Sequence, residues 1–398
     1  MANGLVSKMK KELSLLEPSD ILKFDQDTSS IPGIIKLTLG EPDFNTPEHV
    51  KEAGRRSIAE NRSHYAPSAG TTGLRQAISR FLESKYHLHY NPDNEILVTA
   101  GATEAIYSAL TSILNPGDKV LIPTPTFPLY IPVTMLNKAE PVFLDTSENG
   151  FVLSPQMLEE ALEAHGDAVK AIIFNFPTNP TGVTYRRDAV RALAEVLKKH
   201  EIFVVSDEIY SELTYGAGHV SMAEYLPEQT IVINGASKSH AMTGWRIGFL
   251  CGPADIMTEI GKIHQFAITS TATMAQDAAQ EAFENGVDDG PAMRAEYEKR
   301  RDLVYREIRE MGFECPKPEG AFYLFAKIPE GLIPNSLDFC TDLAHQAKVA
   351  VIPGDSFGPG SAGRIRISYA ASMDELEEAM RRMKTYVTNK IDKRGARQ

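Results

Sequence analysis

The chain has 398 residues, 42% of them hydrophobic and 24% charged, which is typical of a globular protein large enough for two domains. Its formal net charge of -12 argues against a nucleic acid or an anionic membrane as a partner, because both require a positive surface. The three cysteines lack CxxC spacing, no set of metal ligands is grouped, and no apolar run could span a membrane. We therefore expect a cytoplasmic protein without a metal.

The first ninety residues predict an arm, a strand and two helices. Residues 3–18 carry leucine, valine and methionine at helical spacing, which predicts an amphipathic arm lying on a neighbour. A loop over 27–33 precedes a strand over 34–39, and the strand ends at Gly40, where the missing side chain lets a ligand approach the backbone. The pattern then predicts a helix, a loop rich in breakers and a second helix, over His49–Asn61, Tyr65–Gly70 and Gly73–Tyr86.

From Glu95 the chain alternates between short apolar runs and helical patterns. Strands are expected over Ile96–Val98, Lys119–Ile122, Pro141–Leu144, Val169–Phe174, Ile202–Val205 and Ile231–Ile233. Helices are expected over Thr103–Leu114, just after Phe127, and over Pro155–Ala164 and Arg187–His200. This alternation predicts an α/β fold with a mainly parallel mixed sheet between two helical layers. The run Ile247–Leu250 follows the last strand too closely for a crossover helix, so we expect it to be antiparallel.

The C-terminal third has a different pattern of predicted elements. Helices are expected over 272–283 and 293–311, the second being long enough to bridge two domains. Short strands and a final helix from Asp374 then predict a smaller α+β domain. We expect residues 46–288 to form the large domain, and residues 1–45 to join residues 289–398 in the small one.

Chemically useful side chains follow the predicted strands one after another. In open α/β sheets ligands bind beyond the carboxyl ends of the strands, so these side chains are expected to share one site. In chain order they are Gly101, Ala102 and Thr103 at a helix start, Phe127, Asn179, Asp207 with Ile209 and Tyr210, and Ser237, Lys238 and Arg246. Each has an ordinary structural explanation alone, but together they are hard to attribute to chance.

Lys238 and Arg246 indicate the chemistry of this site. Burial of a lysine favours its neutral amine, which attacks carbonyls, and arginine offers a fork for phosphate. This pair favours pyridoxal phosphate, held as a Schiff base on Lys238, with Asp207 keeping its pyridine nitrogen protonated. Two arginines two residues apart, Arg364 and Arg366, are candidates for binding a substrate carboxylate.

The remaining side chains complete this prediction. Asn179 and Tyr210 would bond the ring oxygen, and Phe127 and Ile209 would face the two sides of the ring. Phosphate would be held by Thr103, the amides around Ala102, Ser237 and Arg246.

At this point the sequence resembles the fold-type I, class I/II pyridoxal-phosphate aminotransferases over nearly its whole length. The motifs are Ser237–Gly248 around the lysine, Asn179–Gly182, Asp207–Tyr210, and Arg366 before Ile367-Ser368. The resemblance implies the roles given above, selects Arg366 for the substrate carboxylate, and adds Gly40 to that site. It also implies a homodimer in which Tyr65 reaches the phosphate of the other subunit. One departure is Gly235, where many relatives have a hydroxyl residue that Ser237 would have to replace.

Within the family, Asp207–Tyr215 and Asn234–His240 are most similar to the N-acetyl-LL-diaminopimelate aminotransferases of lysine biosynthesis. This implies an L-amino acid and a 2-oxo acid such as 2-oxoglutarate as substrates. Aromatic-amino-acid and aspartate aminotransferases remain alternatives, as does a pyridoxal-phosphate C–S β-lyase on the same fold. A cofactor-sensing regulator is disfavoured because too few residues precede the first strand for a DNA-binding domain. A nicotinamide enzyme is disfavoured because no GxGxxG follows that strand.

Overall fold

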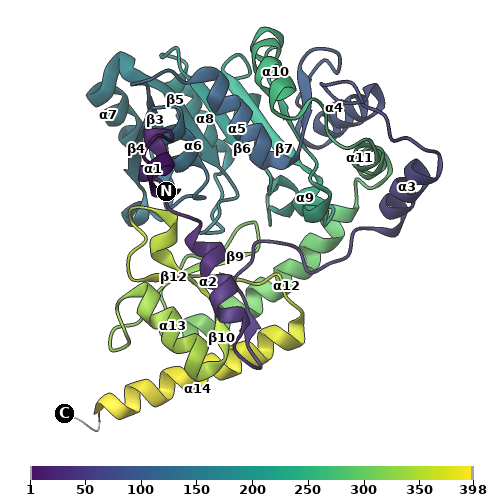
Figure 1. Ribbon diagram of the computed structural model, residues 1–398. Helices are drawn as coiled ribbons and strands as arrows, with labels where there is room; N and C mark the ends of the chain where they lie inside the picture. The colour runs from purple at the N-terminus through teal and green to yellow at the C-terminus, as the bar shows by residue number, and fades with distance from the viewer. Residues whose placement is uncertain (1, 396–398) are drawn as a thin grey trace.

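Seven strands form the central sheet of the computed structural model, which describes residues 2–395 (Figure 1). Their order is β2-β8-β7-β6-β5-β3-β4. The strands are β2 (Ile96–Thr99), β3 (Lys119–Thr124), β4 (Glu140–Asp145), β5 (Val169–Asn175), β6 (Phe203–Asp207), β7 (Thr230–Gly235) and β8 (Gly248–Cys251). Neighbours from β4 to β7 are parallel, whereas β8 is antiparallel to both β7 and β2. The predicted mixed sheet with an antiparallel 247–250 strand is confirmed.

Helices cover both faces of this sheet because alternate strand residues point in opposite directions. One face, with Val120 and Ile122, packs against α5 (Gly101–Ile113), α6 (Tyr130–Leu136) and α10 (Ala254–Ile268). The opposite face, with Leu121, packs against α7 (Pro155–His165) and α8 (Arg187–Leu197). A further core at the β2 end of the sheet involves α3 (Glu48–Ala59), α4 (Thr72–Tyr86) and α11 (Thr273–Asn285).

The C-terminal part builds a second, smaller core. Strands β9 (Tyr323–Lys327), β11 (Ile352–Pro353) and β12 (Arg364–Ser368) form an antiparallel sheet in the order β11-β12-β9. Helices α12 (Asp289–Glu310), α13 (Ser336–Ala347) and α14 (Met373–Gly395) accompany it (Figure 1). Strand β1 (Ile35–Lys36) pairs in parallel with β10 (Val349–Ala350), so the N-terminal segment lies beside this part. That pairing supports the proposed division at residues 45 and 289, which stays a prediction.

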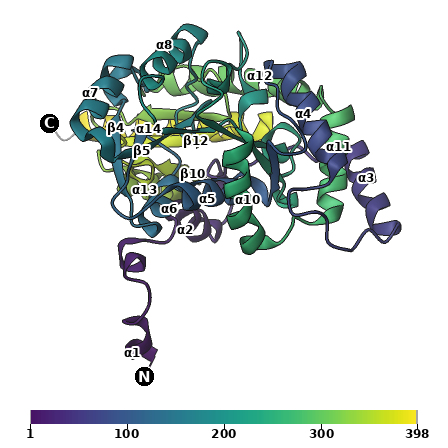
Figure 2. The ribbon, with the colours of Figure 1, turned by 90° about the horizontal axis from the view of Figure 1, so that it is seen from above.

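The N-terminal segment differs from its prediction. Instead of one helix over 3–18 it forms α1 (Ala2–Val6) and a 3-10 turn (Lys11–Leu15), and it extends away from the body of the chain (Figure 2). Its apolar side chains, including Leu5 and Met9, are exposed. Without a surface to pack against, a short amphipathic helix gains too little to form as one piece.

Other differences follow from weak sequence patterns. The predicted loop over 27–33 begins inside helix α2 (Asp20–Ser29), which buries only Phe24 and Thr28 and so has little apolar periodicity. The predicted strand over 34–39 shortens to β1. Helices α10 and α13 were not predicted. Within residues 2–395, no helix combines the length and the apolar character needed to cross a membrane.

Candidate active site

A cavity of about 740 Å³ lies at the carboxyl ends of the central strands. The predicted site residues line it, except Gly101 and Tyr65: they are Gly40, Ala102, Thr103, Phe127, Asn179, Asp207, Ile209, Tyr210, Ser237, Lys238, Arg246 and Arg366. Sequence analysis missed further parts of the lining, among them Asn175, Tyr323 from β9 and the segment Leu15–Leu22. The cavity is therefore enclosed by the large sheet, the small C-terminal core and the N-terminal segment.

Strand register brings the carboxyl ends of β5, β6 and β7 to the same edge of the sheet, and with them Asn175, Asp207 and the segment that leads to Lys238. Asn175 pairs with Asp207 across β5 and β6, and Asp207 pairs with Ile233 across β6 and β7. The Asn175 side chain donates to the Asp207 carbonyl oxygen at 3.0 Å and accepts from the Asn179 backbone N–H at 3.0 Å. Asn175, which sequence analysis did not single out, thus fixes the loop that presents Asn179.

Asp207 is a buried carboxylate with two hydrogen-bond donors. Tyr130 Oη donates to Oδ2 at 2.7 Å, and the Ile209 backbone N–H donates to Oδ1 at 3.2 Å. Burial raises the pKa of Asp207 to about 6, although both donors oppose that rise by stabilising the anion. Tyr130 is a functional candidate that sequence analysis missed. The only indication in the sequence is that it is a tyrosine three residues after Phe127.

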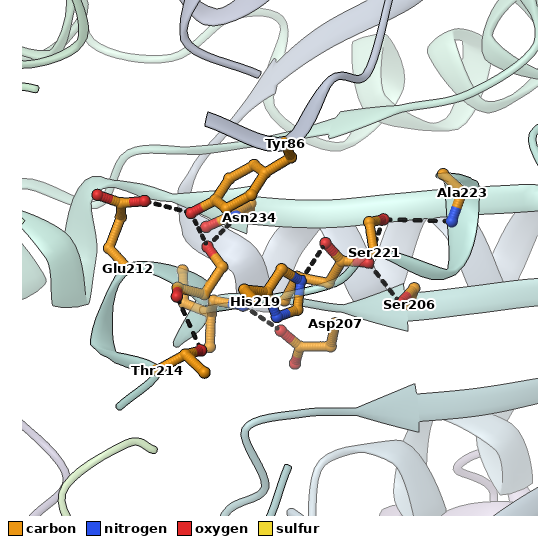
Figure 3. Close-up of polar contacts among 12 residues, drawn as sticks. Tyr86, Ser206, Asp207, Glu212, Thr214, His219, Ser221, Ala223 and Asn234 are labelled. Carbon is orange, nitrogen blue, oxygen red and sulfur yellow. Dashed lines mark hydrogen bonds and ion pairs between the residues drawn. The ribbon is translucent and has the colours of Figure 1, made fainter. Parts of the chain in front are cut away.

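A neighbouring carboxylate, Glu208, does not line the cavity but belongs to a buried polar network, of which Figure 3 labels Ser206, His219 and Ser221. Ser206 and Ser221 donate to its Oε1 at 2.8 and 2.7 Å, and His219 Nε2 lies 2.8 Å from its Oε2. These contacts satisfy Glu208 without any group from the cavity. Asp207 and Glu208 are adjacent in the sequence but have different environments. Of the two, only Asp207 lines the cavity in which a ligand would bind.

Lys238 lies in the short helix α9 (Ala236–Ser239), immediately after β7. Its ammonium donates to the Gly40 carbonyl and lies 5.9 Å from the centre of the Tyr210 ring. Burial lowers the pKa of Lys238 to about 8, and the nearby Arg246 and Arg366 also act in that direction. About a tenth of the amine is thus neutral and nucleophilic at pH 7, far more than for a lysine with an ordinary pKa.

The anion-binding end of the cavity lies at the first turn of α5. Gly101 has a φ of +78°, and a Cβ there would lie 2.6 Å from Arg246 Nη2, so only glycine lets the guanidinium approach this turn. Arg246 is itself in the left-handed region, with φ 54°, which is uncommon for a residue with a side chain. The free amides of the α5 N-terminus, Thr103 and Arg246 together offer a site for a dianion.

Arg366 is the largest fully buried side chain. It donates to Asn179 Oδ1 at 2.9 Å and to the Thr38 carbonyl, and it stacks over the Tyr323 ring at 4.6 Å. Its Nε has no hydrogen-bond partner, and no carboxylate within residues 2–395 forms an ion pair with it. A buried cation without a counter-ion is costly, which favours a carboxylate ligand.

Arg364, two residues away, is only half buried and stacks on Phe151 at 5.0 Å, outside the cavity lining. The structure therefore separates the two arginines that their spacing left equivalent.

Glycines permit two close approaches. A Cβ at Gly40 would collide with the Tyr323 hydroxyl, which hydrogen-bonds the Tyr210 hydroxyl at 2.6 Å. At Gly235, a Cβ would lie 2.8 Å from Gly248 Cα, so this backbone has no room for a hydroxyl side chain there. Ser237, buried two residues later, is the hydroxyl that lines the cavity instead.

The donor set fits pyridoxal phosphate. An aldehyde needs an amine (Lys238), a protonated pyridine nitrogen needs a carboxylate (Asp207), and a phosphate needs the α5 amides and Arg246. Tyr65 does not belong to this set within one chain, because its side chain is 88% exposed and lies outside the lining.

Comparison with known proteins agrees with this geometry. The model of the family "Aminotransferase class I and II" matches residues 32–383. The chain is 45% identical over 376 residues to a probable N-acetyl-LL-diaminopimelate aminotransferase of Bacillus subtilis, covering 94% of each chain. It is 39% identical over 394 residues to an aspartate aminotransferase of the same organism, covering 96% of this chain and 99% of that one. The solved aspartate aminotransferase of Thermus thermophilus with maleate superposes with a TM-score of 0.89, at 34% identity, covering 95% and 99% of the two chains.

Proposed function

Since this chain belongs to the class I and II aminotransferases, which use pyridoxal phosphate, we propose a donor and an acceptor for it: N-acetyl-LL-diaminopimelate and 2-oxoglutarate. The observation that carries the amino-acid half of this proposal is Arg366, a buried guanidinium that has an unpartnered Nε and no ion pair with a carboxylate in the described part of the chain. A fork with free donors matches the two oxygens of an α-carboxylate.

In this proposal different residues bind the cofactor, orient the substrate and transfer the proton. Lys238 and Asp207 would hold the cofactor at its aldehyde carbon and pyridine nitrogen, and Asn179 and Tyr210 at its ring oxygen. When bound, pyridoxal phosphate supplies an electron sink for charge that develops at the substrate α-carbon. Arg366 orients the substrate by its carboxylate, which places the α-proton near Lys238. The neutral Lys238 amine then takes that proton as a general base and returns one to the product.

The choice of donor rests on the similarity to the probable N-acetyl-LL-diaminopimelate aminotransferase of Bacillus subtilis. This donor and 2-oxoglutarate each carry a second carboxylate, as aspartate does. Apart from Lys238, Arg246 and Arg366, none of the lining residues is a lysine or arginine, so one chain offers no spare cation for that second carboxylate. The segment Leu15–Leu22 and the start of α6 supply apolar side chains, with Glu17 and Asp20 among them, and apolar side chains suit the methylene groups of a long donor.

The proposed homodimer completes the site. Tyr65 is exposed and does not line its own cavity, as expected for a side chain that reaches the phosphate site of a second copy. The exposed apolar side chains of the N-terminal segment are consistent with such an assembly.

A comparison of amino donors tests the substrate. With 2-oxoglutarate as acceptor, kcat/KM is expected to be highest for N-acetyl-LL-diaminopimelate among that donor, phenylalanine, tyrosine and aspartate. A preference of more than about tenfold for an aromatic donor, roughly 1.4 kcal/mol of transition-state stabilisation, would transfer the proposal to the aromatic alternative. Release of pyruvate and a thiol from a cysteine conjugate, with no transamination, would favour the C–S β-lyase.

Two matched arginine variants test the carboxylate site. Arg366→Lys keeps the charge but loses the planar fork, so kcat/KM should fall for every amino-acid donor. The loss of about 2–3 kcal/mol of charge-assisted bonding corresponds to roughly 30- to 150-fold. Arg364→Lys, outside the cavity, should change kcat/KM by less than about twofold. The reverse ranking in steady-state kinetics would contradict the assignment of Arg366.

A further inference from the structure

His264 in helix α10 joins two segments that the proposed function uses separately. Its ring is completely buried. Nδ1 lies 3.1 and 3.2 Å from the two carboxylate oxygens of Glu104 in α5, and Nε2 lies 2.8 Å from the Ser68 carbonyl oxygen. Helix α10 packs along α5 (Figure 1), so the ring bridges that helix and the loop over 65–70.

The two partners determine the protonation state of His264. A carbonyl oxygen only accepts hydrogen bonds, so Nε2 must carry the proton that Ser68 receives. In a neutral ring the Nδ1 lone pair would then face the Glu104 carboxylate, which is repulsive. Both contacts are satisfied when the ring is an imidazolium. Burial alone lowers the pKa of His264, but the Glu104 carboxylate and the Ser68 carbonyl raise it above the ordinary value.

No other ionisable group competes for this ring. Strand β2, which also packs against α10, has no titratable side chain. The titratable groups on α5, on α10 and in the loop preceding Ser68 are Glu104, Tyr107, Asp255, Glu259, Lys262, His64 and Tyr65. Within the described chain only Glu104 lies within hydrogen-bond distance of His264, while Glu259 and Lys262 pair with each other at 2.6 Å.

Glu104 connects His264 to the anion-binding turn. Its Oε2 accepts from the Ala100 backbone N–H at 3.1 Å, and its Oε1 accepts from Ser108 at 2.5 Å. Ala100 is the residue that precedes the first turn of α5. On the other side, Ser68 belongs to the loop that presents Tyr65. A single buried side chain therefore links the phosphate end of the cavity to the loop with the exposed phenol.

We propose that His264 is a positioning residue for cofactor retention, whose imidazolium form fixes the first turn of α5 against the loop over 65–70. This inference rests on the assignment of the cofactor phosphate to that turn in the proposed function. When His264 loses its proton, one of its two contacts is lost and the turn and the loop move independently. Cofactor release should therefore accelerate as the pH rises through the pKa of His264.

The test is the rate of pyridoxal phosphate release from the holoenzyme between pH 6 and 9. The wild-type rate is expected to rise with pH. His264→Gln cannot carry the charge, so at low pH it should release cofactor roughly tenfold faster than the wild type, which is the effect of losing one hydrogen bond to a charged group. Its release rate should depend little on pH. Glu104→Gln should move the wild-type rise to lower pH, because it removes the group that favours the imidazolium. His89→Gln, an exposed control, should behave as wild type.

Hydrogen exchange of the apoprotein adds a measurement that needs neither activity nor cofactor. His264→Gln should increase exchange at both 65–70 and 100–104, whereas an unchanged pattern would overturn the link. A wild-type pH profile of release in folded His264→Gln would overturn it as well. Arg246→Ala separates the two proposals. If Arg246→Ala releases cofactor faster and His264→Gln does not, only this inference fails. If Arg246→Ala has no effect, the phosphate assignment fails and the inference fails with it.

Discussion

Lys238→Ala is expected to lower kcat by about 10⁴-fold, the upper range for a group that both takes and returns a proton. The reason is its location: among residues 2–395, Lys238 is the only lysine that lines the cavity, and burial lowers its pKa to about 8. Borohydride reduction of the wild-type holoenzyme should attach the cofactor to the peptide that contains Lys238. The same treatment of Lys238→Ala should leave that peptide unlabelled, as mass spectrometry would show.

Lys262→Ala serves as the control, because Lys262 is exposed and pairs with Glu259 on the surface of α10. It should retain both labelling at Lys238 and turnover. The pKa adds a second measurement: uptake of pyridoxal phosphate by the apoprotein should accelerate as the pH rises through about 8, because only the neutral amine attacks the aldehyde. Labelling of a different lysine would contradict the assignment.

Asp207→Asn is expected to retain the fold and bound cofactor yet lose about 10²–10³-fold in kcat, the usual cost of removing a preorganised electrostatic contact. The substitution preserves the shape of the side chain but removes the anion that would face the pyridine nitrogen. Circular dichroism and cofactor absorbance would verify the fold and the occupancy, and single-turnover kinetics would measure the chemical step. A kcat near that of the wild type would make Asp207 a structural residue.

Tyr130→Phe is the matched control for this experiment, because it removes a donor to Asp207 without removing the anion. Burial places the pKa of Asp207 at about 6, so the anion is present above that pH and is lost as the pH falls through it. Since the Tyr130 hydroxyl lowers this pKa, the acid limb of the kcat profile should move to higher pH in Tyr130→Phe. If the acid limb of Tyr130→Phe lies at the same pH as that of the wild type, the Tyr130 hydrogen bond does not lower the pKa of Asp207.

Sequence alone located the sheet edge of the cavity because the strands from β3 to β7 are parallel. Once strands alternate with helices, the residues after β5, β6 and β7 must meet at one edge, whatever the details of packing. Asn179, Asp207 and Lys238 could therefore be predicted as one group from their positions after three strands. The chemistry of pyridoxal phosphate assigned roles to them, the family resemblance implied the same roles, and the structure places all three in one lining.

Local signals also failed where local stability is low. The segment 3–18 has helical spacing, but Leu5, Met9 and Leu15 are exposed, and the segment forms two short pieces instead of one helix. Helix α2 was missed because only Phe24 and Thr28 of it are buried, which leaves little apolar periodicity. In both cases few side chains are buried, so apolar spacing was a poor guide to where a helix forms.

The sequence by itself determined the order of the elements, the mixed sheet and the candidate amine, carboxylate and amide, because these depend on neighbours along the chain. Only the tertiary structure decided which other side chains form hydrogen bonds with these residues. Tyr130 reaches Asp207 across 77 positions, Tyr323 reaches Tyr210 across 113, and Arg366 reaches Asn179 across 187. The bridge made by His264 is of the same kind. Such contacts arise where separate elements pack, and no periodicity or spacing along the chain encodes which two side chains will meet there.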